Sequence, residues 1–305
     1  MSMTIGFIGL GAMGKPMAMN LIRKGFPVIV RDVNPLPVKE LVEMGAHEGK
    51  GAKEVTLECN LIITMLYNDS IAKEVILGEG GVMKGFRSES ILIDMGTLSP
   101  TTSCLFAKEA KKRGGHYLSA PVTRGPKGAR EGTLTIMVGG EKEVFERCLP
   151  VFQAMGKKIF HVGERPEMGH VFKLVNNFLS ATHSAIAAEA LAFGVKAGAD
   201  PEKLFEVISE GSGNSYKFQL RVPNMLDGNN KLLTLPIRGL HKDISTVIDY
   251  AKDILFPSIF PVIAEQIYLD GIASGLAEKD PSALVELYER KHGISVKRRG
   301  NHNEK

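Results

Sequence analysis

Lys173 and Asn177 form the pair of polar residues that is best placed for proton transfer. They lie four residues apart in MGHVFKLVNNFLSA, residues 168–181, and share one face of a predicted helix that is otherwise apolar. A lysine near apolar groups and another positive charge has a lowered pKa and can exchange a proton with a substrate oxygen. Asn177 would orient that lysine or the substrate. By itself, a helical lysine is more often a solvated surface residue.

An anion-binding loop is predicted within SAPVTRGPKGAREGTLTIMVGG, residues 119–140. Its central residues, Thr123 to Gly128, follow a strand-like run and offer free backbone N–H groups, a hydroxyl and the guanidinium of Arg124. An arginine binds a carboxylate or another planar anion through two parallel hydrogen bonds. The alternative is an ordinary connecting loop without a ligand.

The stretch GFIGLGAMGKPMAMN, residues 6–20, places three glycines between a strand-like and a helix-like run. Gly9, Gly11 and Gly14 match G-x-G-x-x-G, in which the glycines allow a tight turn, the approach of a pyrophosphate, and close packing of helix on strand. The helix N-terminus would present its free N–H groups to the phosphates. Such turns also occur for purely structural reasons. The remaining residues of the predicted binding turn are Leu10, Ala12 and Met13.

Asp32 would supply the second half of a dinucleotide site, because it follows the strand-like run 28–30. A carboxylate there accepts hydrogen bonds from the ribose hydroxyls of NAD and repels the 2′-phosphate of NADP. Asp32 could instead be only a turn residue ahead of Asn34 and Pro35. The neighbouring Arg31 could accommodate a 2′-phosphate, so the sequence favours NAD and leaves NADP possible.

Strand-like and helix-like runs alternate through the first half of the chain. This alternation, with short glycine turns, predicts βαβ units and a Rossmann-type, doubly wound sheet in the α/β class. The expected strands cover residues 5–8, 28–30, 61–66 and 91–94, and the expected helices cover 12–24, 36–44, 70–76 and 101–113. Three further strand-like pieces, HYLSAPVT, TLTIMVGG and KKIFHVG, with a helix over 141–155, would extend the same sheet.

After Gly163 the pattern becomes helical. One long helix is predicted from Met168 to Gly198, and shorter ones over 201–210, 240–252, 257–271 and 281–292. The sequence therefore predicts a dinucleotide-binding domain over residues 1–163 and an all-helical domain over 164–292, joined by the long helix. Residues 293–305 form a basic tail that we expect to be flexible.

Composition favours a cytoplasmic protein without a metal. Of 305 residues, 44% are hydrophobic and 24% charged, as in an ordinary globular enzyme. Cys59, Cys104 and Cys148 have neither disulfide nor metal-ligand spacing. No leader is recognisable and no apolar run approaches the ~18 residues of a membrane span. The net charge of +4 lies largely in the tail, and no aromatic and basic pattern predicts nucleic-acid binding.

Five sequence blocks together resemble those of the β-hydroxyacid dehydrogenase family. This 3-hydroxyisobutyrate dehydrogenase-like family also includes tartronate semialdehyde and succinic semialdehyde reductases. The resemblance covers almost the whole chain. The blocks are FIGLGAMGKPMAMN at 7–20, Met65-Leu66, IDMGTLSP at 93–100, APVTRGPKGAREGTLTIMVGG at 120–140, and KLVNN at 173–177 followed by HKD at 241–243.

The resemblance implies reversible, NAD(P)-dependent oxidation of a small 3-hydroxy acid to its semialdehyde, without a metal. Lys173 matches the family's general acid/base lysine, and Asn177 matches the asparagine that holds the substrate. The implied cofactor contacts are Met65, Leu66, Thr97 and Lys242, and the implied substrate loop consists of Val122, Thr123, Arg124 and Gly125.

The resemblance also implies a homodimer or homotetramer in which the helical domains supply the contact. The long helix carries a run of small residues that would pack on another subunit. These residues are Ser184, Ala185, Ala187 and Ala188.

The substrate loop departs from the family pattern P-V-S-G-G, because Arg124 stands where most relatives have glycine. This cation implies a substrate with a strong or second anionic group. Sulfolactaldehyde reductase, a member of the family, also carries an arginine in this loop, so a close relation to it is one possibility. The rest of its loop differs from GPKGAR, and the approach to Lys173 is also altered, with the sequence GERPEMGH.

Two other functions remain open. A cofactor-binding sensor or scaffold would keep the fold and lack turnover; the altered loop favours it, and the presence of Lys173 and Asn177 argues against it. An imine reductase is the third alternative, but that chemistry is usually associated with loss of the lysine.

Overall fold

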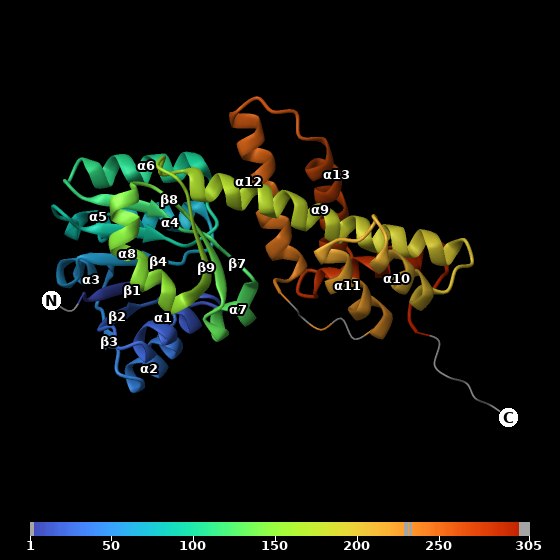
Figure 1. Ribbon diagram of the computed structural model, residues 1–305, viewed down its shortest axis with the longest axis horizontal. Coiled ribbons are helices and arrows are strands. Elements are labelled where there is room, and N and C mark those ends of the chain that lie inside the picture. The colour runs from blue at the N-terminus through green and yellow to red at the C-terminus, as the bar shows by residue number, and fades with distance from the viewer. Residues whose placement is uncertain (1–2, 229–230, 232–233, 299–305) are drawn as a thin grey trace. The chain divides into compact units, whose positions relative to one another are not determined.

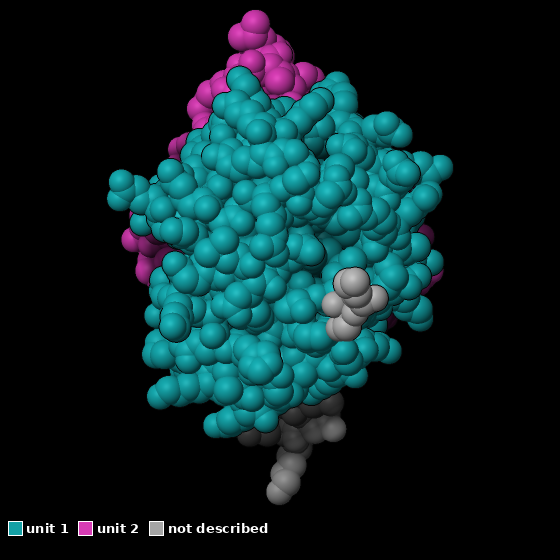
Figure 2. Space-filling view, turned by 90° about the vertical axis from the view of Figure 1, so that its left-hand side faces the viewer, with its two compact units in different colours: residues 1–173 teal, residues 174–305 magenta. Residues whose placement is uncertain are grey.

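The computed structural model describes residues 3–228, 231 and 234–298, and its chain divides into two compact units. Unit 1 comprises residues 1–173 and unit 2 comprises residues 174–305, as coloured in Figure 2. The predicted domain boundary at residue 163 lies at the end of the last strand, whereas the two units divide inside the long helix that follows.

Unit 1 is a Rossmann-type α/β unit with helices on both faces of one sheet (Figure 1). The strands lie in the order β3-β2-β1-β4-β5-β6-β8-β7, and β9 pairs with β8. The strands from β3 to β6 pair in parallel, whereas β8 runs antiparallel to β6 and β7. The predicted α/β class is therefore confirmed, and the three later strand-like pieces do extend the sheet.

The elements of unit 1, in chain order, are β1 (Ile5–Ile8), α1 (Gly14–Arg23), β2 (Val28–Arg31), α2 (Pro35–Glu43), β3 (His47–Glu48), α3 (Ala52–Glu58), β4 (Leu61–Thr64), α4 (Asp69–Leu77), α5 (Val82–Gly85), β5 (Ile91–Asp94), α6 (Pro100–Lys111), β6 (His116–Ser119), β7 (Val122–Thr123), α7 (Gly125–Glu131), β8 (Leu134–Gly139), α8 (Lys142–Met155), β9 (Gly156–Gly163) and the first turns of α9 (Met168–Lys196).

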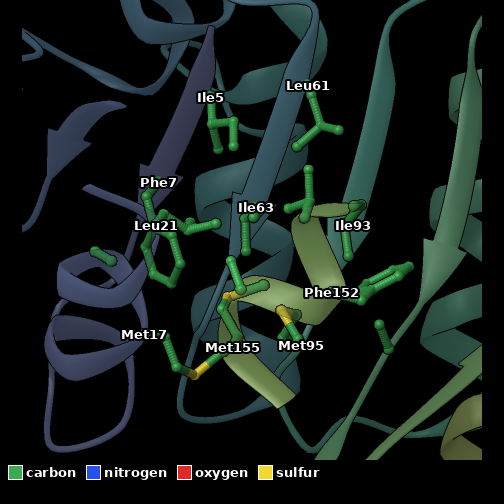
Figure 3. Close-up of a cluster of buried hydrophobic side chains, with 14 of the residues drawn as sticks. Ile5, Phe7, Met17, Leu21, Leu61, Ile63, Ile93, Met95, Phe152 and Met155 are labelled. Carbon is green, nitrogen blue, oxygen red and sulfur yellow. The ribbon is translucent and has the colours of Figure 1, made fainter. Parts of the chain in front are cut away.

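The central strands are apolar on both faces because helices cover both sides of a parallel sheet. Leu61 and Ile63 point to one face, where they join a cluster that includes Leu21 of α1 and Phe152 of α8 (Figure 3). Ile62, between them, belongs to the cluster on the opposite face. This alternation fixes the register of each strand, and with it the loops at the strand ends.

Of the loop that the sequence predicted over residues 123–128, Thr123 ends β7, Arg124 precedes α7, and residues 125–128 form the start of helix α7. Glycine and proline in this stretch suggested a turn, but Pro126 occupies the first turn of the helix, where its missing N–H is not needed. The loop prediction was therefore wrong for these residues.

All described elements of unit 2 are helices. They are the remainder of α9, α10 (Pro201–Glu210), α11 (Tyr216–Asp227), α12 (Ile237–Asp253), α13 (Ile259–Ala273), the 3-10 helix η1 (Pro281–Leu284) and α14 (Val285–His292). Its interior holds a buried ion pair, because Arg221 Nη1 lies 2.7 and 2.6 Å from the two carboxylate oxygens of Asp280.

The small residues of α9 pack inside unit 2 and do not form a surface for another subunit. Ser184, Ala185, Ala187 and Ala188 are at most 3% exposed, and the three alanines belong to the core cluster of the unit. Small side chains let neighbouring helices approach α9 closely. The predicted use of this face for assembly is therefore wrong.

Helix α9 is long and apolar enough, by length and composition, to cross a membrane, with 44% of its most apolar window buried. This differs from the expectation that no apolar run approaches that length. The central helix of a globular unit meets the same criteria, and Ala181, Ala185 and Leu191 of α9 lie in the core of unit 2. We therefore describe α9 as a core helix.

The described part of the tail, residues 293–298, packs on unit 2. Val296 is fully buried, and its N–H donates to a carboxylate oxygen of Glu289 at 2.8 Å. Arg298 forms ion pairs with Glu202 and Asp227, at 3.4 and 3.0 Å. The prediction of a flexible tail therefore does not hold for these residues, and residues 299–305 lie outside the described part of the chain.

Candidate active site

The predicted cofactor residues of unit 1 follow the carboxyl ends of parallel strands. The glycine turn follows β1, Asp32 follows β2, Met65 and Leu66 follow β4, and Thr97 lies in the loop after β5. Strand β1 pairs with both β2 and β4, so the chain order reverses at β1. Sheets of this kind bind ligands at such a reversal, outside the carboxyl ends of the strands. The structure brings these residues to one edge of the sheet.

The structure explains differently why each of the three positions in the turn holds a glycine. Gly9 has φ +98°, and a Cβ there would overlap the carbonyl oxygen of Met65. A Cβ at Gly14 would overlap the carbonyl oxygen of Gly9, so this glycine lets α1 begin directly on the turn. A Cβ at Gly11, in contrast, would have no atom within 4 Å. The fold requires Gly9 and Gly14, whereas Gly11 leaves open space on the exposed side of the turn.

Asp32 holds the glycine turn against the end of β2. One carboxylate oxygen accepts from the N–H of Leu10 at 2.5 Å, and the other accepts from the N–H of Asn34 at 2.8 Å. A carboxylate has about four acceptor positions. These two bonds therefore leave acceptor capacity beside the turn, where ribose hydroxyls could donate.

Lys173 is buried and contacts the predicted substrate segment. Its side chain is 8% exposed, and Nζ donates to the carbonyl oxygen of Val122, the first residue of β7, at 2.7 Å. The alternative of a solvated surface lysine is therefore excluded. The helix and the loop, which are separated by about 50 residues of chain, meet at this ammonium group.

Asn177 and Lys242 belong to unit 2. Asn177 is 3% exposed, and its side-chain Nδ2 has no hydrogen-bond partner among the described residues. Its Oδ1 accepts from Nδ2 of Asn176 at 3.2 Å, so only the NH2 group of Asn177 is left without a partner. A buried donor of this kind is uncommon and is a candidate contact for a ligand. Lys242, on α12, forms an ion pair with Asp243 at 2.7 Å.

Arg124 has a left-handed backbone, with φ +90° and ψ 4°. A residue with a side chain adopts this conformation at a cost of about 1–3 kcal/mol, whereas glycine adopts it readily. A glycine at this position would suit the backbone better. Arg124 is exposed in spite of this strain. Strained residues of this kind cluster at ligand sites.

The sequence analysis missed a buried polar cluster where the start of α9 meets the end of β5. It includes Asp94 and His170, both with no exposed surface. One oxygen of Asp94 accepts from Thr64 Oγ1 at 3.2 Å and from the N–H of Gly96 at 3.1 Å. The other has no hydrogen-bond partner and lies 3.8 Å from Nε2 of His170. Burial is the main cause that raises the pKa of Asp94 to about 7. The available signal was an aspartate directly at the end of an apolar strand.

Comparison with known proteins agrees with this geometry. Residues 4–163 match the family model described as the NAD binding domain of 6-phosphogluconate dehydrogenase. Residues 168–288 match the model described as the NAD-binding domain of NADP-dependent 3-hydroxyisobutyrate dehydrogenase. The chain belongs to the 3-hydroxyisobutyrate dehydrogenase family. The resemblance inferred from the five sequence blocks is confirmed.

Several members of the family match over almost their whole length. The 2-(hydroxymethyl)glutarate dehydrogenase of Eubacterium barkeri is 38% identical, over 97% of this chain and 98% of its own. The 3-sulfolactaldehyde reductase of Escherichia coli is 31% identical, over 96% and 98%. Among solved structures, the 3-hydroxyisobutyrate dehydrogenase of Mycobacterium tuberculosis is 28% identical, with a TM-score of 0.85, over 94% of this chain and 99% of its own.

These comparisons confirm the general function. The chain is an oxidoreductase of the NAD(P)-dependent 3-hydroxyacid dehydrogenase and semialdehyde reductase class. Imine reductases share the fold, but one from Bacillus cereus is only 19% identical, with a TM-score of 0.63. That likeness concerns the fold alone.

The open space beside Gly11 predicts that this glycine is needed for cofactor binding and not for folding. Gly11→Ala should leave the urea unfolding midpoint unchanged and raise the Kd for NADH at least about tenfold, because the added methyl group would meet the pyrophosphate. Gly14→Ala should instead destabilise the protein by about 1–3 kcal/mol, because its methyl group overlaps Gly9. Unchanged NADH affinity in folded Gly11→Ala would contradict this assignment.

Proposed function

We propose that this protein interconverts a small 3-hydroxy acid that carries a second anionic group and its semialdehyde, with NAD(H) as cofactor and Lys173 as general acid/base. The observation that supports this most directly is the burial of Lys173 against Val122, at the start of the substrate segment. A buried ammonium group at the edge where the cofactor residues gather is suited to proton exchange with a substrate oxygen.

In this proposal the residues of the chain divide the work. A nicotinamide cofactor held by the glycine turn and Asp32 would supply hydride transfer in both directions. As a neutral amine, Lys173 would take the hydroxyl proton during oxidation, and as an ammonium group it would give a proton to the carbonyl oxygen during reduction. Nδ2 of Asn177 would donate to the substrate, and the segment of Val122, Thr123, Arg124 and Gly125 would hold its acid group.

The proposed substrate class rests on Arg124 and on the two relatives described above. The substrate in the name of one relative, 2-(hydroxymethyl)glutarate, has two carboxylates, and that of the other has a sulfonate. An exposed guanidinium with a fixed backbone can bind either group through two hydrogen bonds. A specific relation to sulfolactaldehyde reductase is not required by this argument.

The preference for NAD(H) rests on Asp32. Its carboxylate stands at the end of β2 and is fixed by the N–H groups of Leu10 and Asn34. A fixed negative charge at this position would repel a 2′-phosphate. Met65, Leu66 and Thr97 would complete the part of the cofactor site that unit 1 supplies, and Lys242 is the further cofactor contact that the family resemblance implies.

We propose the cytoplasm as the compartment of this enzyme. Cys59, Cys104 and Cys148 are all free thiols, which a reducing compartment maintains. Cell fractionation followed by an assay of NADH oxidation tests this assignment.

A turnover assay tests the proposed chemistry. With a panel of anionic semialdehydes, the protein should oxidise NADH with a higher kcat/KM than NADPH. Lys173→Ala should lower kcat at least about 100-fold and leave the Kd for NADH nearly unchanged, the scale of lost general acid/base catalysis. Lys203→Ala, which removes an exposed lysine paired with Glu206, is the control. NADH binding without turnover on any substrate would favour a sensor.

A substitution at Arg124 tests the substrate class. Arg124→Gly should raise KM for the anionic substrate by about 10- to 150-fold, because a hydrogen bond to a charged group contributes about 1.5–3 kcal/mol. An uncharged aldehyde of similar size should be almost unaffected. Because glycine relieves the left-handed strain, unfolding cannot explain the loss. Equal losses on both substrates would show that Arg124 only shapes the segment.

We propose that the protein assembles as a homodimer or homotetramer through unit 2. Leu179, Ile186 and Phe193 recur at intervals of seven along α9 and are 48%, 48% and 75% exposed. Exposed apolar residues also lie in the connection between α12 and α13 and in the first turn of α13, including Leu255 and Phe260. Large exposed apolar patches indicate protein contacts.

Light scattering tests this assembly. The mass in solution should be a multiple of 33.1 kDa, and Phe193→Asp should reduce that mass. A monomeric mass for the unmodified protein would refute the assembly.

A further inference from the structure

His170 lies in the first turn of α9, three residues before Lys173, and both of its ring nitrogens have partners. Nδ1 lies 2.5 Å from Oγ of Ser103, which belongs to α6. Nε2 lies 3.2 Å from the carbonyl oxygen of Gly96, in the loop after β5. One side chain therefore joins the start of α9 to two separate segments of unit 1.

The partners of His170 determine which nitrogen carries the proton in the neutral ring. The carbonyl oxygen of Gly96 can only accept, so Nε2 carries the hydrogen and donates it. Nδ1 then accepts from the hydroxyl of Ser103. Because the two nitrogens have different roles, the ring has one orientation that satisfies both bonds.

Asp94 fixes the carbonyl group that His170 uses. Its carboxylate accepts from the N–H of Gly96, the same residue whose carbonyl oxygen accepts from Nε2. Its second oxygen lies 3.8 Å from Nε2, beyond hydrogen-bond distance, and Tyr117 also interacts with this carboxyl group. The cluster is fully buried, and low polarity strengthens such interactions.

Next to His170, the helix backbone itself touches the sheet. Gly169 N–H donates to Ser119 Oγ at 3.2 Å, and a Cβ at Gly169 would lie 2.6 Å from the carbonyl oxygens of Ser119 and Met137. This contact fixes the distance of α9 from β6 and β8. The ring of His170 then fixes the rotation of the first turn about the helix axis, which decides where a side chain three residues further on points.

We infer that His170 is a positioning residue for Lys173, which it orients through Ser103 and the Asp94–Gly96 turn. This inference rests on the proposed role of Lys173 as the acid/base group. His170 does not touch the substrate in this role. It acts because a small displacement of a catalytic group strongly lowers the rate.

A double-mutant cycle tests this inference. His170→Phe keeps the ring and removes both nitrogens; it should lower kcat at least about tenfold, with KM and the Kd for NADH within about twofold. His170→Gln, which can still donate to Gly96, should recover part of the rate. In the Lys173→Ala background, His170→Phe should cause no further loss, because residues that act as one unit are not additive. A further loss of similar size there would overturn the inference.

Ser103→Ala gives a milder variant that removes the donor to Nδ1, together with the longer contact of the hydroxyl to the carbonyl oxygen of Ser99 at 3.5 Å, and it should lower kcat about threefold or more. Thr56→Val is its matched control, since it removes a buried hydroxyl that bonds only within α3. If His170→Gln and Ser103→Ala both keep the full rate of the unmodified enzyme, the positioning role is wrong. Full activity in Lys173→Ala would instead refute the proposed function itself.

Discussion

The position of Lys173 depends on the direct contact between the backbone of α9 and the ends of β6 and β8. A Cβ at Gly139 would lie 2.5 Å from the amide nitrogen of Gly169, and a Cβ at Gly169 would meet Ser119 and Met137. No side chain fits between helix and sheet at this point. The start of α9 is therefore fixed by backbone atoms, which have no rotamers to change, and Lys173 one turn later reaches the carbonyl of Val122.

A direct backbone contact that only glycine allows also forms the expected cofactor turn after β1. Gly14 lets α1 begin against the carbonyl oxygen of Gly9, so that the N-terminus of α1 lies directly beyond the carboxyl end of β1. A helix N-terminus attracts anions through its free N–H groups. At α1 this creates the expected pyrophosphate position, and at α9 it brings the lysine to the edge where the substrate segment lies. Two helices that begin on backbone contacts thus place the glycine turn and Lys173 within unit 1.

The sequence predicted those parts of the structure that have a local pattern. The buried strands and long helices follow from apolar periodicity, and Lys173 near the segment at Val122 follows from the resemblance. Helix α7 was missed because the same glycine and proline residues fit a turn or a helix start, and α11 (Tyr216–Asp227) was missed because its pattern contains Pro223. Asp94 and His170 were missed because a buried polar pair has no periodic signature: only the tertiary contact shows that they meet.

Arg124 combines a strained, left-handed backbone with the role that we propose for it in substrate specificity. Its left-handed conformation suits glycine, while Val122 on one side accepts from Lys173 and α7 begins at Gly125 on the other. The segment therefore accommodates the arginine while Lys173 keeps its bond to Val122. In the proposed function, a guanidinium could therefore be added to, or removed from, the substrate segment while the position of Lys173 stays the same. This separation of substrate recognition from chemistry would give a physical reason why one fold can serve 3-hydroxy acids with different second anionic groups.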